Sequence, residues 1–129
     1  MAEHNEIGKI GEKIAKAFLM KQGFSIIEIN YPTRYGEIDI VAKKGQTLHF
    51  VEVKSVKVKD FADIANLAIQ PEDNLTAKKW SRIVISAQTY LKHRNVPHET
   101  LWCIDLACVY INPLRKEGKV KLLENIHKE

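Results

Sequence analysis

The chain has 129 residues, of which 45% are hydrophobic and 28% are charged, and its formal net charge is +4. This length suits one domain (1–129) with a hydrophobic core, is too short for two ordinary domains, and the composition is that of a soluble globular protein. No apolar stretch is long enough to span a membrane, and residues 1–9 lack the apolar region of a signal peptide. We therefore expect a cytoplasmic protein with no membrane partner. The modest basic excess is compatible with a phosphate-rich partner.

The hydrophobic pattern predicts alternating helices and strands along the chain. Helical spacing predicts an amphipathic helix over 3–22 that ends at Gly23. An isoleucine-rich strand over 24–30 and a turn over 30–36 follow, and then two strands joined by a turn at Gly45-Gln46. The later elements are a short helix over 60–69, a long helix over 76–94, a buried strand over 101–112 and a last strand over 119–123. This order, α-β-β-β-α-β-β, predicts an α/β fold with a central mixed sheet flanked by helices.

Two short runs alternate charged with apolar residues on the strands before and after Gly45-Gln46. They are Gly-Glu-Ile-Asp-Ile at 36–40 and Phe-Val-Glu-Val-Lys at 50–54. If Gly45-Gln46 is a two-residue turn, counting outward sets Asp39 opposite Glu52 and Glu37 opposite Lys54. Like charges across a ladder repel, and carboxylates in an apolar setting must be neutralised. A divalent cation would do this, Mg²⁺ first and Mn²⁺ as an alternative, because hard cations take oxygen ligands.

A second interpretation of the same pattern needs no metal. A strand with one wet face also alternates apolar and charged residues, so these charges could form a solvated surface. The predicted register also depends on regular pairing, since a single bulge would move every pair by one residue.

The cysteines and histidines indicate no further metal site. Cys103 and Cys108 lie five residues apart on a predicted strand and so face opposite sides. This spacing disfavours both a local disulfide and a zinc pair, and we expect the two cysteines to be buried and reduced. The histidines show no ligand spacing on any one element. Asp105 interrupts an otherwise apolar strand, and we expect it to make a structural hydrogen bond.

Basic and aromatic residues suggest where a nucleic acid could bind. Lys78, Lys79 and Arg82 share the polar face of the helix over 76–94, either as a solvated surface or as phosphate contacts. Tyr31 and Tyr35 lie in the predicted turn before the acidic strand and could stack on a base.

The chain resembles the YraN-like family of bacterial proteins, which in turn resembles archaeal Holliday-junction resolvases of the PD-(D/E)XK nuclease superfamily. The resemblance covers most of the chain, and its most specific part is the pair of runs at 36–40 and 50–54. It is also carried by Gly-Glu-Lys-Ile-Ala at 11–15, Asn30, Arg34, Lys79, Ala87, Tyr90-Leu91 and Ile-Asp-Leu at 104–106. The resemblance implies a restriction-endonuclease-like fold. Val56 departs from the pattern, because relatives often carry an arginine two residues after the lysine.

The resemblance also implies roles for individual residues. Asp39 and Glu52 would be metal ligands, the Val53 carbonyl a third, and Glu12 a further ligand, direct or through water. Lys54 would orient or help deprotonate the attacking water, or stabilise charge on the phosphate. The remaining implied or expected contributors are Glu37 as a supporting acid, Lys79 as a phosphate contact, and Lys78, Arg82, Arg34 and Tyr35 as further nucleic-acid contacts.

Three functions are compatible with these residues. The first is a metal-dependent endonuclease or nuclease-like protein that hydrolyses phosphodiesters in DNA, branched DNA included, and a two-fold junction would suit a homodimer. The second is a nucleic-acid-binding module with the same fold and little or no catalysis. The third is a protein-interaction adaptor with a vestigial site.

Overall fold

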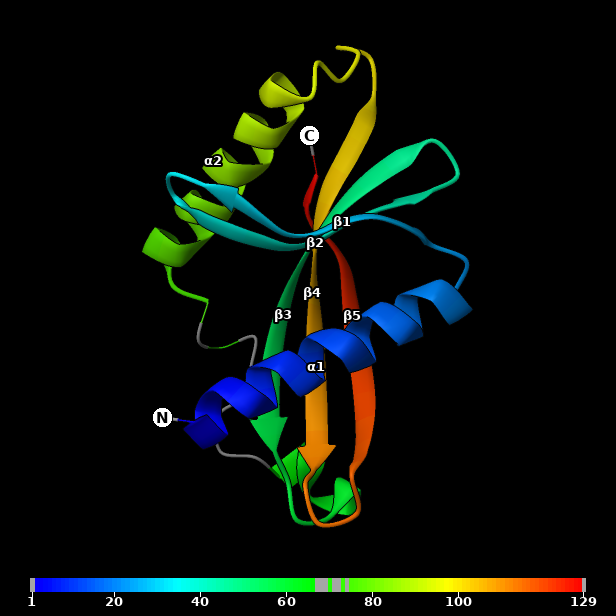
Figure 1. Cartoon of the computed structure of the whole chain (residues 1–129), viewed down its shortest axis with the longest axis vertical. Coiled ribbons are helices and arrows are strands. Elements are labelled where there is room, and N and C mark those ends of the chain that lie inside the picture. Colours follow the sequence, from blue (N-terminus) through cyan, green and yellow to red (C-terminus); the bar gives the residue numbers. More distant parts are fainter. Residues whose placement is uncertain (1, 67–69, 71–72, 74, 129) are drawn as a thin grey trace.

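One mixed sheet of five strands, in the order β1-β2-β3-β4-β5, forms the centre of the molecule (Figure 1). The computed structural model describes residues 2–66, 70, 73 and 75–128. The elements are α1 (Ala2–Lys21), β1 (Ser25–Thr33), β2 (Gly36–Lys44), β3 (Thr47–Lys57), the 3₁₀ helix η1 (Phe61–Asn66), α2 (Ala77–His93), β4 (Leu101–Asn112) and β5 (Glu117–Lys128). The predicted order is confirmed, and the arrangement is a restriction-endonuclease-like α/β fold.

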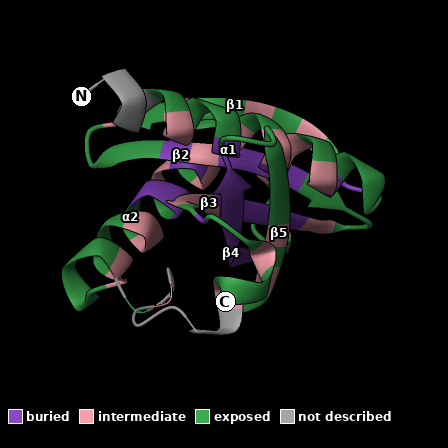
Figure 2. Ribbon diagram, turned by 90° about the horizontal axis from the view of Figure 1, so that it is seen from below, coloured by how far each residue is buried: buried purple, intermediate pink, exposed green. Residues whose placement is uncertain are grey.

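The pairing of the strands explains why β4 is almost wholly apolar. Neighbouring strands pair antiparallel, except that β3 and β4 are parallel. The chain joins this parallel pair by a crossover through η1 and α2. β4 therefore lies between two strands with elements packed on both of its faces, and every residue of it except Leu101 is buried (Figure 2).

The two long helices cover opposite faces of the sheet. On one face α1 packs through Ala15 and Leu19 against a cluster that includes Val51 and Val109. On the other face α2 packs through Ala87 and Tyr90 against a cluster of Ile38, Val41, Leu48, Phe50, Trp102 and Ile104. Among the described residues, no helix is long and apolar enough to cross a lipid bilayer.

Three predicted boundaries are wrong. β1 continues to Thr33, so the turn before β2 is only two residues long. Pro32 is accommodated because β1 is an edge strand, where a missing N–H disrupts no second ladder. The last turn falls at 113–116, because Asn112 Oδ1 accepts the N–H groups of residues 114 and 115. β5 therefore starts earlier than predicted, and it also ends later because its pairing with β4 continues to residue 128.

The segment 57–74, whose sequence pattern was the hardest to interpret, is described in part. Asp60 Oδ1 accepts a hydrogen bond from Ala62 N (2.9 Å), and the short helix that it was expected to start is the 3₁₀ helix η1. Of the predicted end of that helix, residues 69 and 71 lie outside the described residues, and residue 70 has no regular secondary structure.

Candidate functional site

β2 and β3 separate in the middle of their hairpin. The turn at 45–46 pairs Lys44 with Thr47 as predicted, and the ladder continues to Ile40 and Val51, where it ends. Beyond that point Asp39 Oδ2 accepts a hydrogen bond from Val53 N at 2.8 Å. The predicted ladder pairs of residue 39 with 52 and of 37 with 54 are therefore wrong.

The physical reason is a strong twist of β2 at Asp39. Ile38 packs on the α2 side of the sheet, whereas Ile40 packs on the α1 side. Residues two apart share one face of a regular strand, so this change of side means that β2 turns as it leaves β3 and follows β1. The carboxylate of Asp39 then accepts the Val53 N–H of β3, in place of a backbone carbonyl of β2.

Asp39 and Glu52 nevertheless lie together. The pKa of Glu52 is raised to about 8 by burial, by the negative charge of Asp39 and by a hydrogen bond with it, and Lys54 lowers it only in part. Two carboxylates that share a half-buried place cannot both ionise without cost. The juxtaposition expected from the sequence is thus present, by side-chain contact rather than ladder pairing.

Glu12 joins these acids from α1. Its pKa is raised by burial and by the charges of Asp39 and Glu37, and a hydrogen bond from Asn30 opposes this rise. Gly11 permits the approach of the helix, because a Cβ there would overlap the Ser55 hydroxyl and lie 3.0 Å from Ser55 Cβ. We refer to Glu12, Asp39 and Glu52 as the acid cluster.

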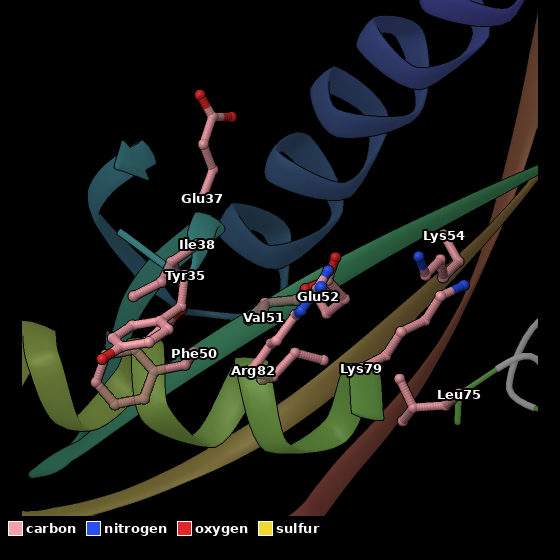
Figure 3. Close-up of a pocket in the computed structure, with 12 residues that line it drawn as sticks. Tyr35, Glu37, Ile38, Phe50, Val51, Glu52, Lys54, Leu75, Lys79 and Arg82 are labelled. Carbon is pink, nitrogen blue, oxygen red and sulfur yellow. The ribbon is translucent and has the colours of Figure 1, made fainter. Parts of the chain in front are cut away.

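Basic side chains share a cleft of about 190 Å³ with Glu52 (Figure 3), whereas Glu12 and Asp39 are not among the residues that line it. Lys54 of β3 lines it on one side and Lys79 and Arg82 of α2 on the other, and Figure 3 shows Lys79 extended toward Lys54. Thr76 fixes the start of α2 by accepting a hydrogen bond from Lys79 N at 3.2 Å. Lys78 is exposed and is not among the residues that line the cleft.

The other predicted contributors lie at the mouth of the cleft. Glu37 lines it, but its carboxylate points away from Lys54 in Figure 3. Tyr35 is 43% exposed and also lines the cleft, with the Arg34 guanidinium carbon 5.8 Å from its ring centroid. Tyr31 instead packs edge-on against Tyr90, with the ring centroids 4.9 Å apart, so its role is in the core.

Sequence reasoning missed two features. Asn30 appeared only as part of the family resemblance, yet it adopts a positive φ of 50° and bonds Glu12. A second group, His49, Cys103 and Asp105, brings three potential ligand atoms within 4.8 Å of one another. No ligand spacing along the sequence indicated this group, because the residues come together through strand pairing. The predicted structural hydrogen bond of Asp105 is confirmed by Asn125 N at 2.9 Å.

The protein belongs to the class of α/β proteins with a restriction-endonuclease-like fold. Three acids and a lysine lie at the point where β2 and β3 part. The chain matches the model of the uncharacterised protein family UPF0102 over residues 11–109. It therefore belongs to the UPF0102 family, which agrees with the YraN-like resemblance.

Relatives in this family match over nearly their whole length. A UPF0102 protein of Wolinella succinogenes is 38% identical over 119 residues, which is 92% of this chain and 94% of the relative. One of Flavobacterium psychrophilum is 35% identical over 125 residues, 97% of this chain and 96% of the relative. One of Dictyoglomus turgidum is 34% identical over 110 residues, 85% and 86% respectively.

Proposed function

We propose that this protein is a metal-dependent endonuclease that hydrolyses phosphodiester bonds in DNA, branched DNA included. The observation that carries the proposal is the acid cluster beside Lys54, in which neighbouring charge and burial raise the pKa of Glu52 to about 8. Carboxylates held together against their own repulsion favour a cation between them. A solvated strand face, the second interpretation of the sequence pattern, would not crowd its acids in this way.

The donors suit Mg²⁺ or Mn²⁺. Oxygen atoms of Asp39, Glu52 and the Val53 carbonyl would hold the ion, with Glu12 as a further ligand, direct or through water. The hydrogen bond from Val53 N orients the Asp39 carboxylate before any ligand arrives. Bound there, the metal would lower the pKa of a water molecule and polarise the phosphate.

The basic wall of the cleft supplies the rest of the chemistry. The Lys54 ammonium would orient the attacking water or stabilise the charge that grows on the phosphate oxygens. Lys79 and Arg82 would hold the flanking phosphates, Arg82 through its planar fork of donors. Tyr35 is exposed at the mouth of the cleft, where a base lifted from its stack could lie on its ring.

The test is cleavage of a plasmid, a linear duplex and a four-way junction with and without Mg²⁺ or Mn²⁺. We expect metal-dependent cleavage that a chelator stops. Glu52→Gln and Lys54→Met should each lower the rate at least about a hundredfold, the size seen when one group that stabilises transition-state charge is removed.

Two exposed residues provide matched controls for these substitutions. Glu117 lies at the start of β5 and Lys92 near the end of α2, and both are exposed. Glu117→Gln and Lys92→Met should cut at the wild-type rate. If Glu52→Gln also cuts at that rate, the activity belongs to a contaminant and the proposal fails.

A second candidate function is nucleic-acid binding without cleavage. The observation that favours it is the placement of Lys79 and Arg82 on one wall of the cleft, in a protein of net charge +4. Binding would then weaken steeply with salt, weaken further in Lys79→Ala and Arg82→Ala, and need no metal. Retained binding with no cleavage in either metal would favour this function over the first.

A further inference from the structure

A second group of potential ligands lies on the opposite face of the strand that carries Glu52. His49 of β3 is the direct neighbour of Cys103 in the parallel ladder with β4, and Asp105 lies two residues further along on the same face. All three side chains are buried, on the side of the sheet that packs against α1. We refer to these three residues as the His49 cluster.

The three residues bring one potential ligand atom each within 4.8 Å of one another, around a common centre. His49 Nδ1 lies 3.2 Å from Cys103 Sγ and 2.6 Å from Asp105 Oδ2, and Cys103 Sγ lies 3.5 Å from Asp105 Oδ1. Ligands of tetrahedral zinc stand roughly 3.3 to 3.8 Å apart, given bond lengths of about 2.0 to 2.3 Å. Because Cys103 and His49 contact different oxygens of Asp105, the carboxylate would have to rotate and the imidazole to withdraw from it for all three residues to bind one ion.

The cluster is hydrogen-bonded as it stands, because His49 and Cys103 each reach a different oxygen of Asp105, but two of its contacts converge on the same nitrogen. His49 Nδ1 carries a single hydrogen or a single lone pair, yet a carboxylate oxygen and a sulfur both approach it. Only one of them can form a strong bond with that nitrogen. A metal ion at the centre would bond to all three ligand atoms at once.

A bulge in β5 opens the cluster to a cavity. The ladder between β4 and β5 shifts register between residues 104 and 106, and Asn125 has a positive φ of 55° and donates its N–H to Asp105 Oδ1. The bulge places Glu124 and Asn125 on the wall of a cavity of about 370 Å³ that His49 and Cys103 also line. The cavity is a route of entry for an ion, and the carboxylate of Glu124 is a candidate fourth ligand.

We propose that His49, Cys103 and Asp105 bind a thiophilic transition metal, Zn²⁺ in the first instance, with Glu124 or water in the fourth position. The mixed nitrogen, sulfur and oxygen donors select against Mg²⁺ and suit zinc. A thiolate and a carboxylate together balance the charge of the dication. The ion would join β3 to β4 and, through Glu124, to β5, and it would lie on the face of β3 opposite to Glu52.

Cobalt titration of the full chain, reduced and freed of metal by a chelator, tests this site. Co²⁺ bound by a thiolate gives an intense charge-transfer absorption that Mg²⁺ cannot produce. We expect the band to saturate at one equivalent of Co²⁺ and to disappear when one equivalent of Zn²⁺ is added. A folded wild-type protein, checked by circular dichroism, that shows no such band overturns the proposal.

Matched variants locate the site. Cys103→Ser should abolish the band, whereas Cys108→Ser should keep it, because Cys108 is a second buried thiol on the other face of β4. Persistence of the band in Cys103→Ser, or its loss in a folded Cys108→Ser, contradicts the assignment. His49→Gln should bind Zn²⁺ at least about tenfold more weakly in competition with a chromophoric chelator. Glu52→Gln should leave the band unchanged, so this test and the cleavage test fail independently.

Discussion

Glu52 of the acid cluster and His49 of the His49 cluster lie close together along β3, on its opposite faces, yet the two clusters accommodate buried charge in different ways. In the acid cluster, burial and the neighbouring like charges raise the pKa of Glu52 and Glu12. In the His49 cluster, the Asp105 carboxylate accepts bonds from an imidazole and from a backbone N–H. The first arrangement gathers carboxylates that repel one another, whereas the second pairs its carboxylate with hydrogen-bond donors. The two faces of one strand can therefore hold carboxylates at very different electrostatic cost.

The largest difference between the clusters should appear when one carboxylate is removed. Asp105→Ala leaves the His49 imidazole and the Asn125 N–H without their buried partner, and we expect it to lower the free energy of unfolding by about 3 to 5 kcal/mol. Glu52→Ala removes a repelling charge instead. Urea unfolding of both variants at pH 8 with a chelator measures the contrast, and equal destabilisation would contradict it.

A second experiment disturbs the acid cluster from a distance. In Gly11→Ala the new methyl group overlaps Ser55, so α1 must shift and carry Glu12 with it. Overpacking of this kind costs about 1 to 3 kcal/mol. We expect weaker Mg²⁺ binding by calorimetry together with an unchanged cobalt band.

The double variant Gly11→Ala, Ser55→Gly is the control. It restores the space between α1 and β3, and both stability and Mg²⁺ affinity should recover in part. No recovery would mean that Gly11 acts through something other than this contact.

The smallest effect is a pH dependence. The folded pKa of Glu52 is about 8, above the value of 4.5 that is ordinary for a glutamate, so the folded chain keeps a proton that the unfolded chain releases between these pH values. The free energy of unfolding contributed by this group therefore falls as the pH rises from about 4.5 to 8. One pKa unit corresponds to about 1.4 kcal/mol, and with solvent screening in the open cleft we expect a total change of about 1 to 2 kcal/mol.

Glu52→Gln provides the matched comparison. It cannot titrate, so its stability in the presence of a chelator should change less between pH 5 and pH 8 than that of the wild type. Urea unfolding at the two pH values measures this, and parallel curves for the two proteins would rule out the raised pKa.

The sequence was informative where the interactions are local. The apolar spacing in α2 predicted the helix within one residue at each end, and the structure shows Thr76 as its N-cap. The two-residue turn at 45–46 fixed the first pairs of the hairpin, and the runs that flank it identified Asp39, Glu52 and Lys54. The family resemblance added Glu12, which no local pattern distinguishes from an ordinary surface glutamate.

The sequence was uninformative where distant packing decides. The twist at Asp39 depends on Ile38 and Ile40 finding different helices, which a simple count outward from the turn cannot reveal. His49 and Cys103 are 54 residues apart and meet only because β3 and β4 pair in parallel. Asn30 contacts Glu12 through a left-handed backbone conformation that no pattern in the strand indicated.

The parallel pairing of β3 and β4 also governs how the chain folds as it is made. β2 and β3 can form their hairpin as soon as both have left the ribosome, whereas the partner for the other edge of β3 begins only at Leu101. Until then the edge of β3, which carries the buried residues Phe50 and Val51, can pair with another chain. Closing so long a loop is slow, so nascent chains at high expression should aggregate through β3 before they are complete.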